Sequence, residues 1–172
     1  MLSSTSIMQP MRFQDLTLED QFLLDEAERA MANGYGPYSG IHSGCAVRSL
    51  YKRVYVGANF EQAMHTIGIC AEQAALAAAN TASDRALEAL ALIATSQKGP
   101  IAEPLTPCGS CRQCLYEFAE LADRDVLVIC SDTAKSKIVV VTIRELLPRG
   151  VGPHTLQVNT DRYRPLLPKP SF

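Results

Sequence analysis

Apolar residues recur at helical spacing in the stretch TLEDQFLLDEAERAMANG, where Phe22, Leu23 and Ala27 share one side of a helix. Thr17 and Asp20 resemble a capping box at the start of this helix, and a glycine follows its end. The alanine-rich segment CAEQAALAAAN predicts a second helix. A third is expected from about residue 108 to 122. The segment TIRELLP predicts a short fourth one, in which Thr142 and Glu145 make a second capping box.

Alternating apolar and polar residues predict strands between these helices. A β-hairpin is indicated by GCAVRSL and RVYVGA, and residues 59–69 are expected to form a loop. The segment ALEALALIATS ends in a buried strand from Leu90 to Thr95, and DVLVIC and KIVVVTI predict two more. The order α-β-β-α-β-α-β-β-α predicts an α/β protein with one sheet covered by helices.

The length of 172 residues fits one domain with a substantial core. We expect a polar N-terminal tail at 1–13, a catalytic domain at 14–157 and a proline-rich tail at 158–172. No apolar run reaches the ~20 residues of a membrane helix, and the N-terminus lacks a signal-peptide pattern, so we expect a cytoplasmic protein that binds no membrane. The net charge of -2 argues against a nucleic-acid partner, which usually needs a clustered basic surface.

Thiols stay reduced in the cytoplasm, so six cysteines in a cytoplasmic chain suggest metal binding, catalysis or core packing before disulfides. Cys45 and Cys130 lie in strand patterns, where we expect buried apolar thiols, and we expect Cys114 to pack as well. Cys108 and Cys111 stand at a helix start in PCGSC, a spacing shared by thiol redox pairs and zinc sites.

A third thiol favours zinc over a redox pair. Cys70 also opens a predicted helix, so two helix N-termini could bring it together with Cys108 and Cys111. Three thiolates leave the fourth corner of a zinc tetrahedron for water, which is typical of a catalytic site. Glu72, two residues past a ligand, could move a proton from that water to a leaving group. With Pro107, these residues complete the C/H-x-E…P-C-x-x-C signature of the zinc-dependent nucleobase deaminases.

The chain resembles the small cytidine deaminases beyond these residues. The resemblance covers about residues 20–155. Four segments occur in the order and at about the spacing seen in that family: YGPYSGIHSGCAV, VGANFEQAMHTIGICAEQAAL, TPCGSCRQCLYEF and TIRELLPRGVGP. The all-cysteine site is similar to that of the homotetrameric branch. The resemblance implies a three-layer α/β/α fold, with a mixed five-stranded sheet and helices on both faces.

The resemblance also implies an activity, which is hydrolytic deamination of cytidine, deoxycytidine or a modified analogue to the uracil nucleoside and ammonia. Cys70, Cys108 and Cys111 would bind one Zn²⁺ per chain, and Glu72 would act as general acid and base.

The remaining contacts implied by the family concern the nucleoside and the neighbouring subunits. Asn59 and Glu61 would hydrogen-bond the ribose, and the backbone around Ala71 and Cys108 would hold the ring. The chain would form a homotetramer, or a dimer, in which neighbouring subunits contribute to each pocket.

One departure from the family pattern concerns the metal. Gln73 stands where the family usually has an arginine that offsets the charge of zinc with three thiolates. The helix N-termini and Arg112 could compensate, and we expect an active site with a shifted pH or rate profile.

Other departures concern the base. Ile41, followed by His42, and Val151 replace aromatic residues that pack on the base at roughly 1 kcal/mol each, and His65 replaces a tyrosine. These changes predict a roomier pocket. They favour a modified cytosine nucleoside, or a cytosine-containing antibiotic such as blasticidin S, over plain cytidine. A non-catalytic zinc-binding protein on the same fold is the alternative from another class, and Glu72 argues against it.

Overall fold

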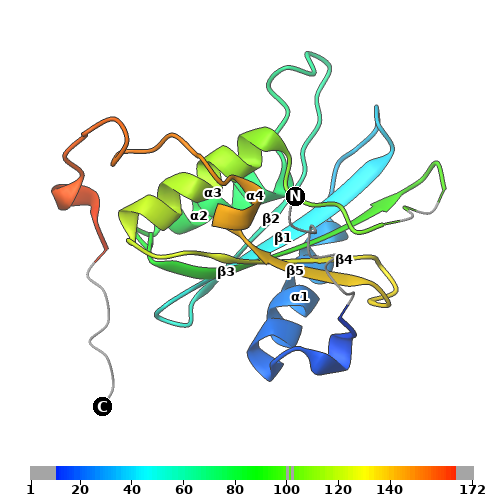
Figure 1. Ribbon diagram of the computed structural model, residues 1–172. Coiled ribbons are helices and arrows are strands. Elements are labelled where there is room, and N and C mark those ends of the chain that lie inside the picture. Colours follow the sequence, from blue (N-terminus) through cyan, green and yellow to red (C-terminus); the bar gives the residue numbers. More distant parts are fainter. Residues whose placement is uncertain (1–10, 100, 102, 166–172) are drawn as a thin grey trace, which may run out of the picture.

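The computed structural model describes residues 11–99, 101 and 103–165. Of the expected tails, residues 1–10 and 166–172 lie outside this part of the chain. Helices lie on both faces of one five-stranded sheet (Figure 1), which confirms the three-layer α/β/α fold. No helix in the described part is long and apolar enough to cross a membrane.

The sheet is mixed, as expected. Its strands are β1 (Ile41–Ser49), β2 (Val54–Ala58), β3 (Leu87–Ser96), β4 (Leu127–Ser131) and β5 (Ile138–Thr142). They lie in the order β2-β1-β3-β4-β5, in which β3 and β4 are parallel and the other neighbours antiparallel. The predicted hairpin is formed by β1 and β2. The strand β3 begins earlier than the predicted Leu90, because Leu87 pairs with Ser49 across a register shift.

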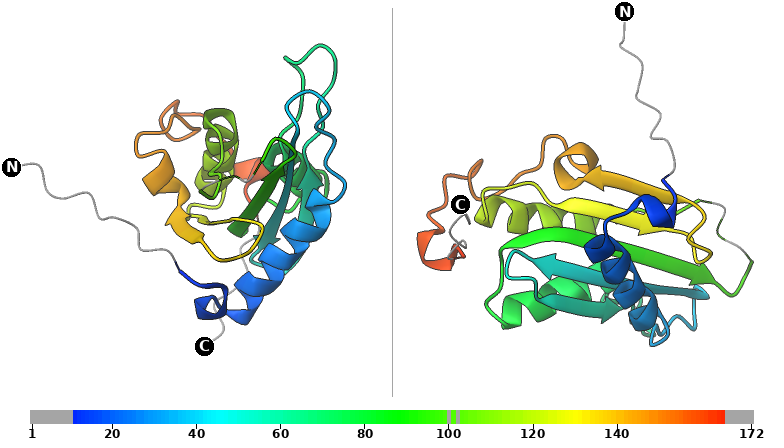
Figure 2. Two further views of the ribbon diagram at one scale, coloured as in Figure 1. Left: turned by 90° about the vertical axis from the view of Figure 1, so that its right-hand side faces the viewer. Right: turned by 90° about the horizontal axis from the view of Figure 1, so that it is seen from below.

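Helices are divided between the two faces of the sheet. The helix α1 (Leu18–Met31) lies on one face, and α2 (Ala71–Thr81), α3 (Gly109–Leu121) and α4 (Ile143–Leu146) lie on the other (Figure 2). Two short 3-10 turns, η1 (Phe13–Asp15) and η2 (Asp161–Tyr163), precede and follow them. A hydrophobic core lies on each face of the sheet, and the side chains of β3 alternate between the two cores. Its leucines pack toward α2 and α3, and its smaller or branched residues pack toward α1.

The expected helix caps are present. The Thr17 hydroxyl accepts a hydrogen bond from the Asp20 backbone N–H at 3.2 Å. At α4, Thr142 accepts from the Glu145 N–H, and the Glu145 carboxylate accepts from the Thr142 N–H, which completes a capping box. These local bonds explain why the sequence predicts where both helices start.

Two glycines let helices approach the sheet closely. A Cβ on Gly44 of β1 would lie 2.0 Å from the Ala27 carbonyl oxygen of α1, and one on Gly57 of β2 would lie 2.4 Å from the Ala71 carbonyl oxygen of α2. Such distances are far below van der Waals contact, so a side chain at Gly57 would displace the start of α2. That start carries Cys70.

A buried arginine joins the α1 layer to the sheet. Arg48 of β1 is 8% exposed and donates to Asp20 of α1 at 2.8 Å and to Glu88 of β3. Removing one partner from such a buried ionic group lowers the stability of the fold, because the remaining charges lose their compensation.

The segment before α1 is attached to the edge of the sheet. The Met11 N–H donates to the Ile138 carbonyl oxygen of β5 at 3.0 Å.

Candidate active site

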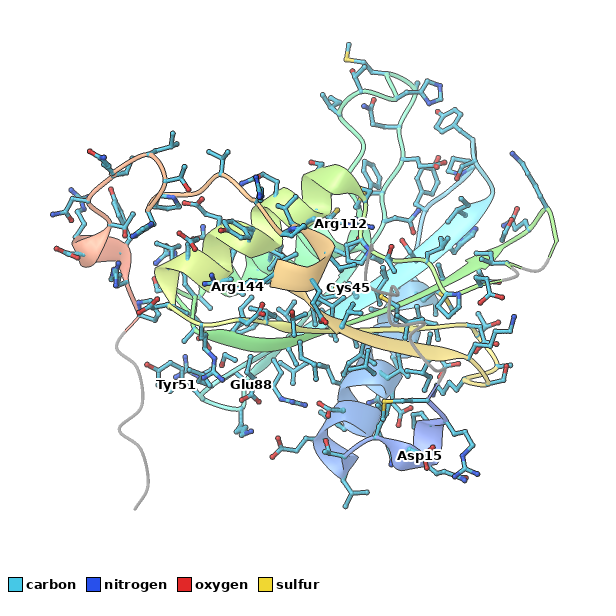
Figure 3. All side chains as sticks on the ribbon, viewed as in Figure 1. Asp15, Cys45, Tyr51, Glu88, Arg112 and Arg144 are labelled. Carbon is cyan, nitrogen blue, oxygen red and sulfur yellow. The ribbon has the colours of Figure 1, made fainter. Side chains whose placement is uncertain are left out.

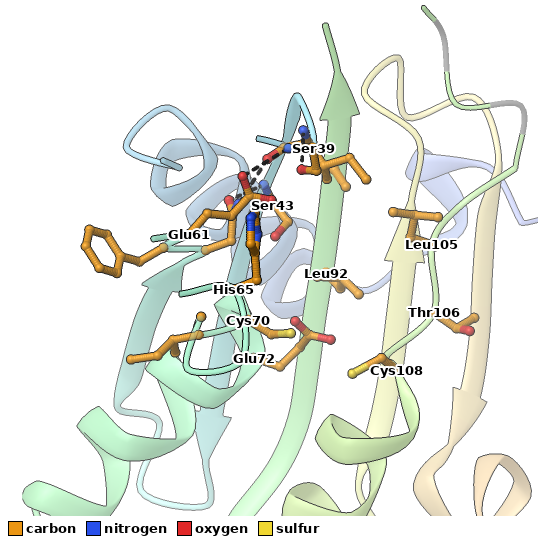
Figure 4. A pocket seen from close by; sticks show the side chains of 16 residues that line it. Ser39, Ser43, Glu61, His65, Cys70, Glu72, Leu92, Leu105, Thr106 and Cys108 are labelled. Atoms are coloured by element: carbon orange, nitrogen blue, oxygen red, sulfur yellow. Dashed lines mark hydrogen bonds between the residues drawn. The ribbon is translucent and has the colours of Figure 1, made fainter. Parts of the chain in front are cut away.

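The starts of α2 and α3 carry the three candidate metal ligands. Cys70 is the N-cap residue of α2 and Cys108 the N-cap residue of α3, both with extended backbone angles, and Cys111 lies in the first turn of α3. The two helix starts lie side by side at the same edge of the layer (Figure 4). All three Sγ atoms lie within 4.8 Å of one another, and those of Cys108 and Cys111 are 3.5 Å apart.

This thiol cluster lies close to the geometry that zinc requires. Tetrahedral zinc with Zn–S bonds of about 2.3 Å places its sulfur ligands about 3.8 Å apart. All six cysteines of the chain are free, so Cys108 and Cys111 are not joined as a disulfide. Cys70 and Cys108 both stand at helix N-termini, where backbone N–H groups without a partner inside the helix point outward. The residues present therefore fit a zinc ion bound by three cysteines.

Hydrogen bonds within the cluster shift the pKa values of its thiols. A hydrogen bond from the Cys111 thiol lowers the pKa of Cys70 to about 7, and the same bond raises the pKa of Cys111, which is the donor. One thiol of this cluster is thus ready to ionise near neutral pH, as a metal ligand must.

Glu72 is the acidic side chain closest to the cluster in sequence. It lies in the first turn of α2, only 5% exposed, and burial raises the pKa of its carboxyl group. Figure 4 shows the carboxylate between Cys70 and Cys108, facing the cavity above them. A carboxyl group with a pKa raised by burial is suited to both accept and donate a proton.

A cavity of about 440 Å³ opens above the thiol cluster, within the range of small-molecule sites. Its walls come from alternate residues of β1 and β3, from the 59–69 loop and from the segment before Cys108. The apolar part is formed by Ile41, Phe60, Ile69, Leu92, Ala94 and Leu105. The polar part is formed by Ser39, Ser43, Asn59, Glu61, His65 and Thr106.

Asn59 and Glu61 line this cavity and also hold its rim. The Asn59 amide donates to the Ile41 carbonyl oxygen at 2.9 Å and accepts from the Ser43 N–H at 2.8 Å. A Glu61 oxygen accepts from the N–H groups of Tyr38 and Ser39 at 2.9 and 3.1 Å. Hydrogen bonds from Ser39 lower the pKa of Glu61, so its carboxylate stays ionised.

His65 stands at the mouth of the cavity. Its backbone has a φ of +52°, a left-handed conformation that histidine adopts more readily than most residues. Its ring contacts the ring of Tyr38 edge-on, with centroids 4.8 Å apart. His42 pairs with Gln97 at 2.9 Å and is not among the residues that line the cavity.

Val151 lies apart from this cavity in the single chain. It is 51% exposed and lines a second groove, between α3 and the segment after α4, and its carbonyl oxygen accepts from the Gln113 amide at 2.7 Å. Ala71 is fully buried directly after Cys70. The predicted roles of both residues in substrate binding stay predictions.

Gln73 and Arg112 lie beside the thiol cluster and bond to other groups. The Gln73 amide donates to the Ser110 hydroxyl at 2.9 Å. The Arg112 guanidinium donates to oxygen atoms of the segment before Cys108 and of α4. Their expected action on a thiolate-bound zinc also stays a prediction.

Several cavity residues were missed by sequence reasoning. Ser43, Leu92 and Ala94 lie in strands, where alternation signals only which face a side chain occupies. Leu105 and Thr106 precede the PCGSC motif, and this proximity was the available signal for them.

Comparisons with known proteins agree with this geometry. Residues 17–129 match the family model described as the cytidine and deoxycytidylate deaminase zinc-binding region. The cytidine deaminase of Halalkalibacterium halodurans is 34% identical over 131 residues, which cover 76% of this chain and 92% of that protein. That of Sporosarcina psychrophila is 30% identical, over 73% of this chain and 86% of its own length.

Solved structures extend the comparison to the fold. The crystal structure of cytidine deaminase from Burkholderia pseudomallei superposes with a TM-score of 0.68 at 28% identity, over 79% of this chain and all of the other. That of the Mycobacterium tuberculosis enzyme gives 0.61 at 29% identity, over 79% of this chain and 99% of its own.

Proposed function

The chain belongs to the cytidine and deoxycytidylate deaminase family, and from this premise we propose that it deaminates a cytosine nucleoside hydrolytically, releasing the uracil nucleoside and ammonia. The observation that carries the proposal is the buried carboxylate of Glu72 beside three thiols at the floor of a nucleoside-sized cavity. A structural zinc site has no need of such a carboxylate or of an open cavity above it.

Cys70, Cys108 and Cys111 would hold one zinc ion per chain. When bound, zinc supplies Lewis acidity that makes water a nucleophile near neutral pH. Glu72 would accept the proton of the attacking water and deliver protons to the ring nitrogen and to the departing amine. At C4 of the base a C–O bond forms and the bond to the amino nitrogen breaks, so water and nucleoside give uracil nucleoside and ammonia.

The other cavity residues would orient the nucleoside and exclude water. Leu92 and Ala94 form an apolar wall beside the reacting ring, and the backbone around Ala71 and Cys108 would hold its polar edge. Glu61 has one carboxylate oxygen bonded to the rim, and its other oxygen could accept a hydrogen bond from a ribose hydroxyl. Asn59 would fix the rim against which the sugar rests.

We extend the proposal to a substrate other than plain cytidine. Ile41 lines the cavity at a position where the family has an aromatic ring, and it is 36% exposed. With less aromatic surface and more room, the cavity favours a modified cytosine nucleoside or blasticidin S. His65 at the mouth adds a polar group for a substituent on the sugar side.

A homotetramer is proposed as the functional assembly. The 59–69 loop beside the cavity exposes Phe60, Met64, Ile67 and Ile69, an apolar surface typical of an interface between chains. The exposed Val151, remote from its own cavity, is available to a neighbour. A cytoplasmic location is also proposed, because zinc-binding thiols must stay reduced.

The proposal is tested by ammonia release and ultraviolet absorbance with zinc-loaded protein. The panel is cytidine, deoxycytidine, N4- and C5-modified cytosine nucleosides, blasticidin S, adenosine and guanine. We expect turnover of a cytosine compound, a modified one best, and a loss of at least 100-fold in kcat for Glu72→Gln, because general acid–base catalysis contributes 10²–10⁴-fold.

The matched control is Glu26→Gln, which removes a carboxylate from α1 on the opposite face of the sheet and should leave kcat unchanged. Zinc retained without turnover of any compound would contradict the deaminase and favour a binding protein. Plain cytidine as the best substrate of the panel would contradict only the altered preference.

A further inference from the structure

A pair of polar side chains, Gln73 and Ser110, joins the first turns of α2 and α3. Gln73 lies three residues after Cys70 on α2, and Ser110 lies between Cys108 and Cys111 on α3. The Gln73 Nε2 atom donates to the Ser110 Oγ atom at 2.9 Å and lies 4.0 Å from the Cys114 Sγ atom. This bond therefore bridges two helices within one turn of every candidate ligand.

The bond between Gln73 and Ser110 lies where the distance between Cys70 and the other two cysteines is determined. Cys108 and Cys111 share a helix, so their separation depends on one turn of α3. Cys70 comes from α2, which packs mainly on β1 and β2, and its distance from the other two depends on how the two helices lie relative to each other. Metal sites tolerate deviations of only a few tenths of an ångström in ligand distance.

The partners of Gln73 also distinguish its role from charge compensation. Within the described part of the chain, its amide donates to a hydroxyl and to the thiol of Cys114, which lies outside the cluster of three thiols. A neutral amide bonded to these groups cannot offset the charge of the thiolates. It can hold the two helix starts together.

We propose that Gln73 is a positioning residue, which holds Cys70 at ligand distance from Cys108 and Cys111 by its hydrogen bond to Ser110. This inference rests on the proposed zinc site and does not depend on the substrate. Since the bond ties the two sides of the site, its loss should loosen the metal without removing a ligand.

The test is a double-mutant cycle on zinc release, measured as the rate at which a chromophoric chelator takes zinc from the loaded protein. We expect Gln73→Ala and Ser110→Ala each to accelerate release about fivefold, the size of one ordinary hydrogen bond. The double variant should release zinc no faster than Gln73→Ala, because that single variant has already lost the bond to Ser110. Ser110→Thr, which keeps the hydroxyl, should release zinc at the wild-type rate.

Gln113→Ala is the matched control. It removes an amide hydrogen bond of similar length from α3, to the Val151 carbonyl oxygen, on a side of the helix that faces the second groove. Its zinc release should equal that of the wild type. Ser110 is exposed, so Ser110→Ala remains informative even if Gln73→Ala disturbs the fold.

Unchanged zinc release in Ser110→Ala, or single effects that add in the double variant, would overturn the positioning role. A wild-type chain that binds zinc without deaminating any compound would overturn the proposed function and leave this inference standing. A wild-type chain that binds no zinc would overturn both.

Discussion

The cysteines of this chain occupy two opposite environments. Cys70 and Cys108 cap helices at the edge of a cavity, and a hydrogen bond from a neighbouring thiol lowers the pKa of Cys70 to about 7. Cys45 and Cys130 lie fully buried in β1 and β4, as the strand patterns predict. Burial raises the pKa of Cys45 and raises that of Cys130 to about 12.

This contrast predicts the order in which the thiols react. At pH 8, above the pKa of Cys70 and far below that of Cys130, the first is mostly thiolate and the second remains a thiol. After zinc removal by a chelator, iodoacetamide should label Cys70 within minutes, whereas the buried Cys45 and Cys130 should react only in denaturant. Peptide mass spectrometry gives the order, and early labelling of Cys130 in the folded protein would contradict it.

At the scale of elements, Arg112 connects the segment before Cys108 to α4. Its Nε atom donates to the Pro107 carbonyl oxygen at 2.7 Å, and its terminal nitrogens donate to the Thr106 hydroxyl at 3.0 Å and to the Leu146 carbonyl oxygen at 3.2 Å. The side chain lies where α3 and α4 meet (Figure 3). One guanidinium group thus holds the segment that walls the cavity and leads into the metal ligands.

Arg112→Lys should weaken this connection, because an ammonium group cannot reach three acceptors in the planar arrangement of a guanidinium. We expect the free energy of unfolding to fall by roughly 2–3 kcal/mol, since hydrogen bonds to charged groups contribute about 1.5–3 kcal/mol each and some are retained. Urea unfolding measures the change. Arg149→Lys, at an exposed position after α4, is the control and should have little effect; equal stability of both variants would disprove the connecting role.

At the scale of the whole molecule, one group of exposed apolar side chains lies on the 59–69 loop beside the cavity. Met64 and Ile67 at the tip of the 59–69 loop are each 65% exposed, and Tyr35 stacks on Phe60 at its base with centroids 5.5 Å apart. Leaving such side chains in water is unfavourable, so association of chains would bury them. The surface lies next to the active site, and assembly would therefore also close the cavity.

We expect the protein to sediment at four times the chain mass of 18.7 kDa. The double substitution Met64→Lys and Ile67→Lys should lower this mass and reduce kcat/KM, because charges would be placed in the interface. Leu18→Lys is the matched control. Leu18 is more exposed, at 82%, but it lies at the start of α1, on the face of the sheet opposite α2 and α3. A monomer at micromolar concentration would rule out the proposed assembly.

Local physics made much of this molecule predictable from the sequence. The order of helices and strands follows from hydrophobic periodicity, and the starts of α1 and α4 follow from caps such as Thr142 with Glu145. Three thiols and a glutamate at fixed spacing indicated the candidate metal site, because Cys70, Cys108 and Cys111 each lie at a helix start that the sequence itself marks.

Contacts between distant segments were decided by the tertiary structure alone. Pairing with β1 determined the early start of β3, and the packing of α2 against α3 determined that Gln73 bonds to Ser110, 37 residues away. The walls of the cavity come from strands and loops that no local pattern connects. The sequence by itself determined which chemical groups are present and in which elements, since those are local properties. Folding determined which of them meet, because a contact depends on the positions of both partners.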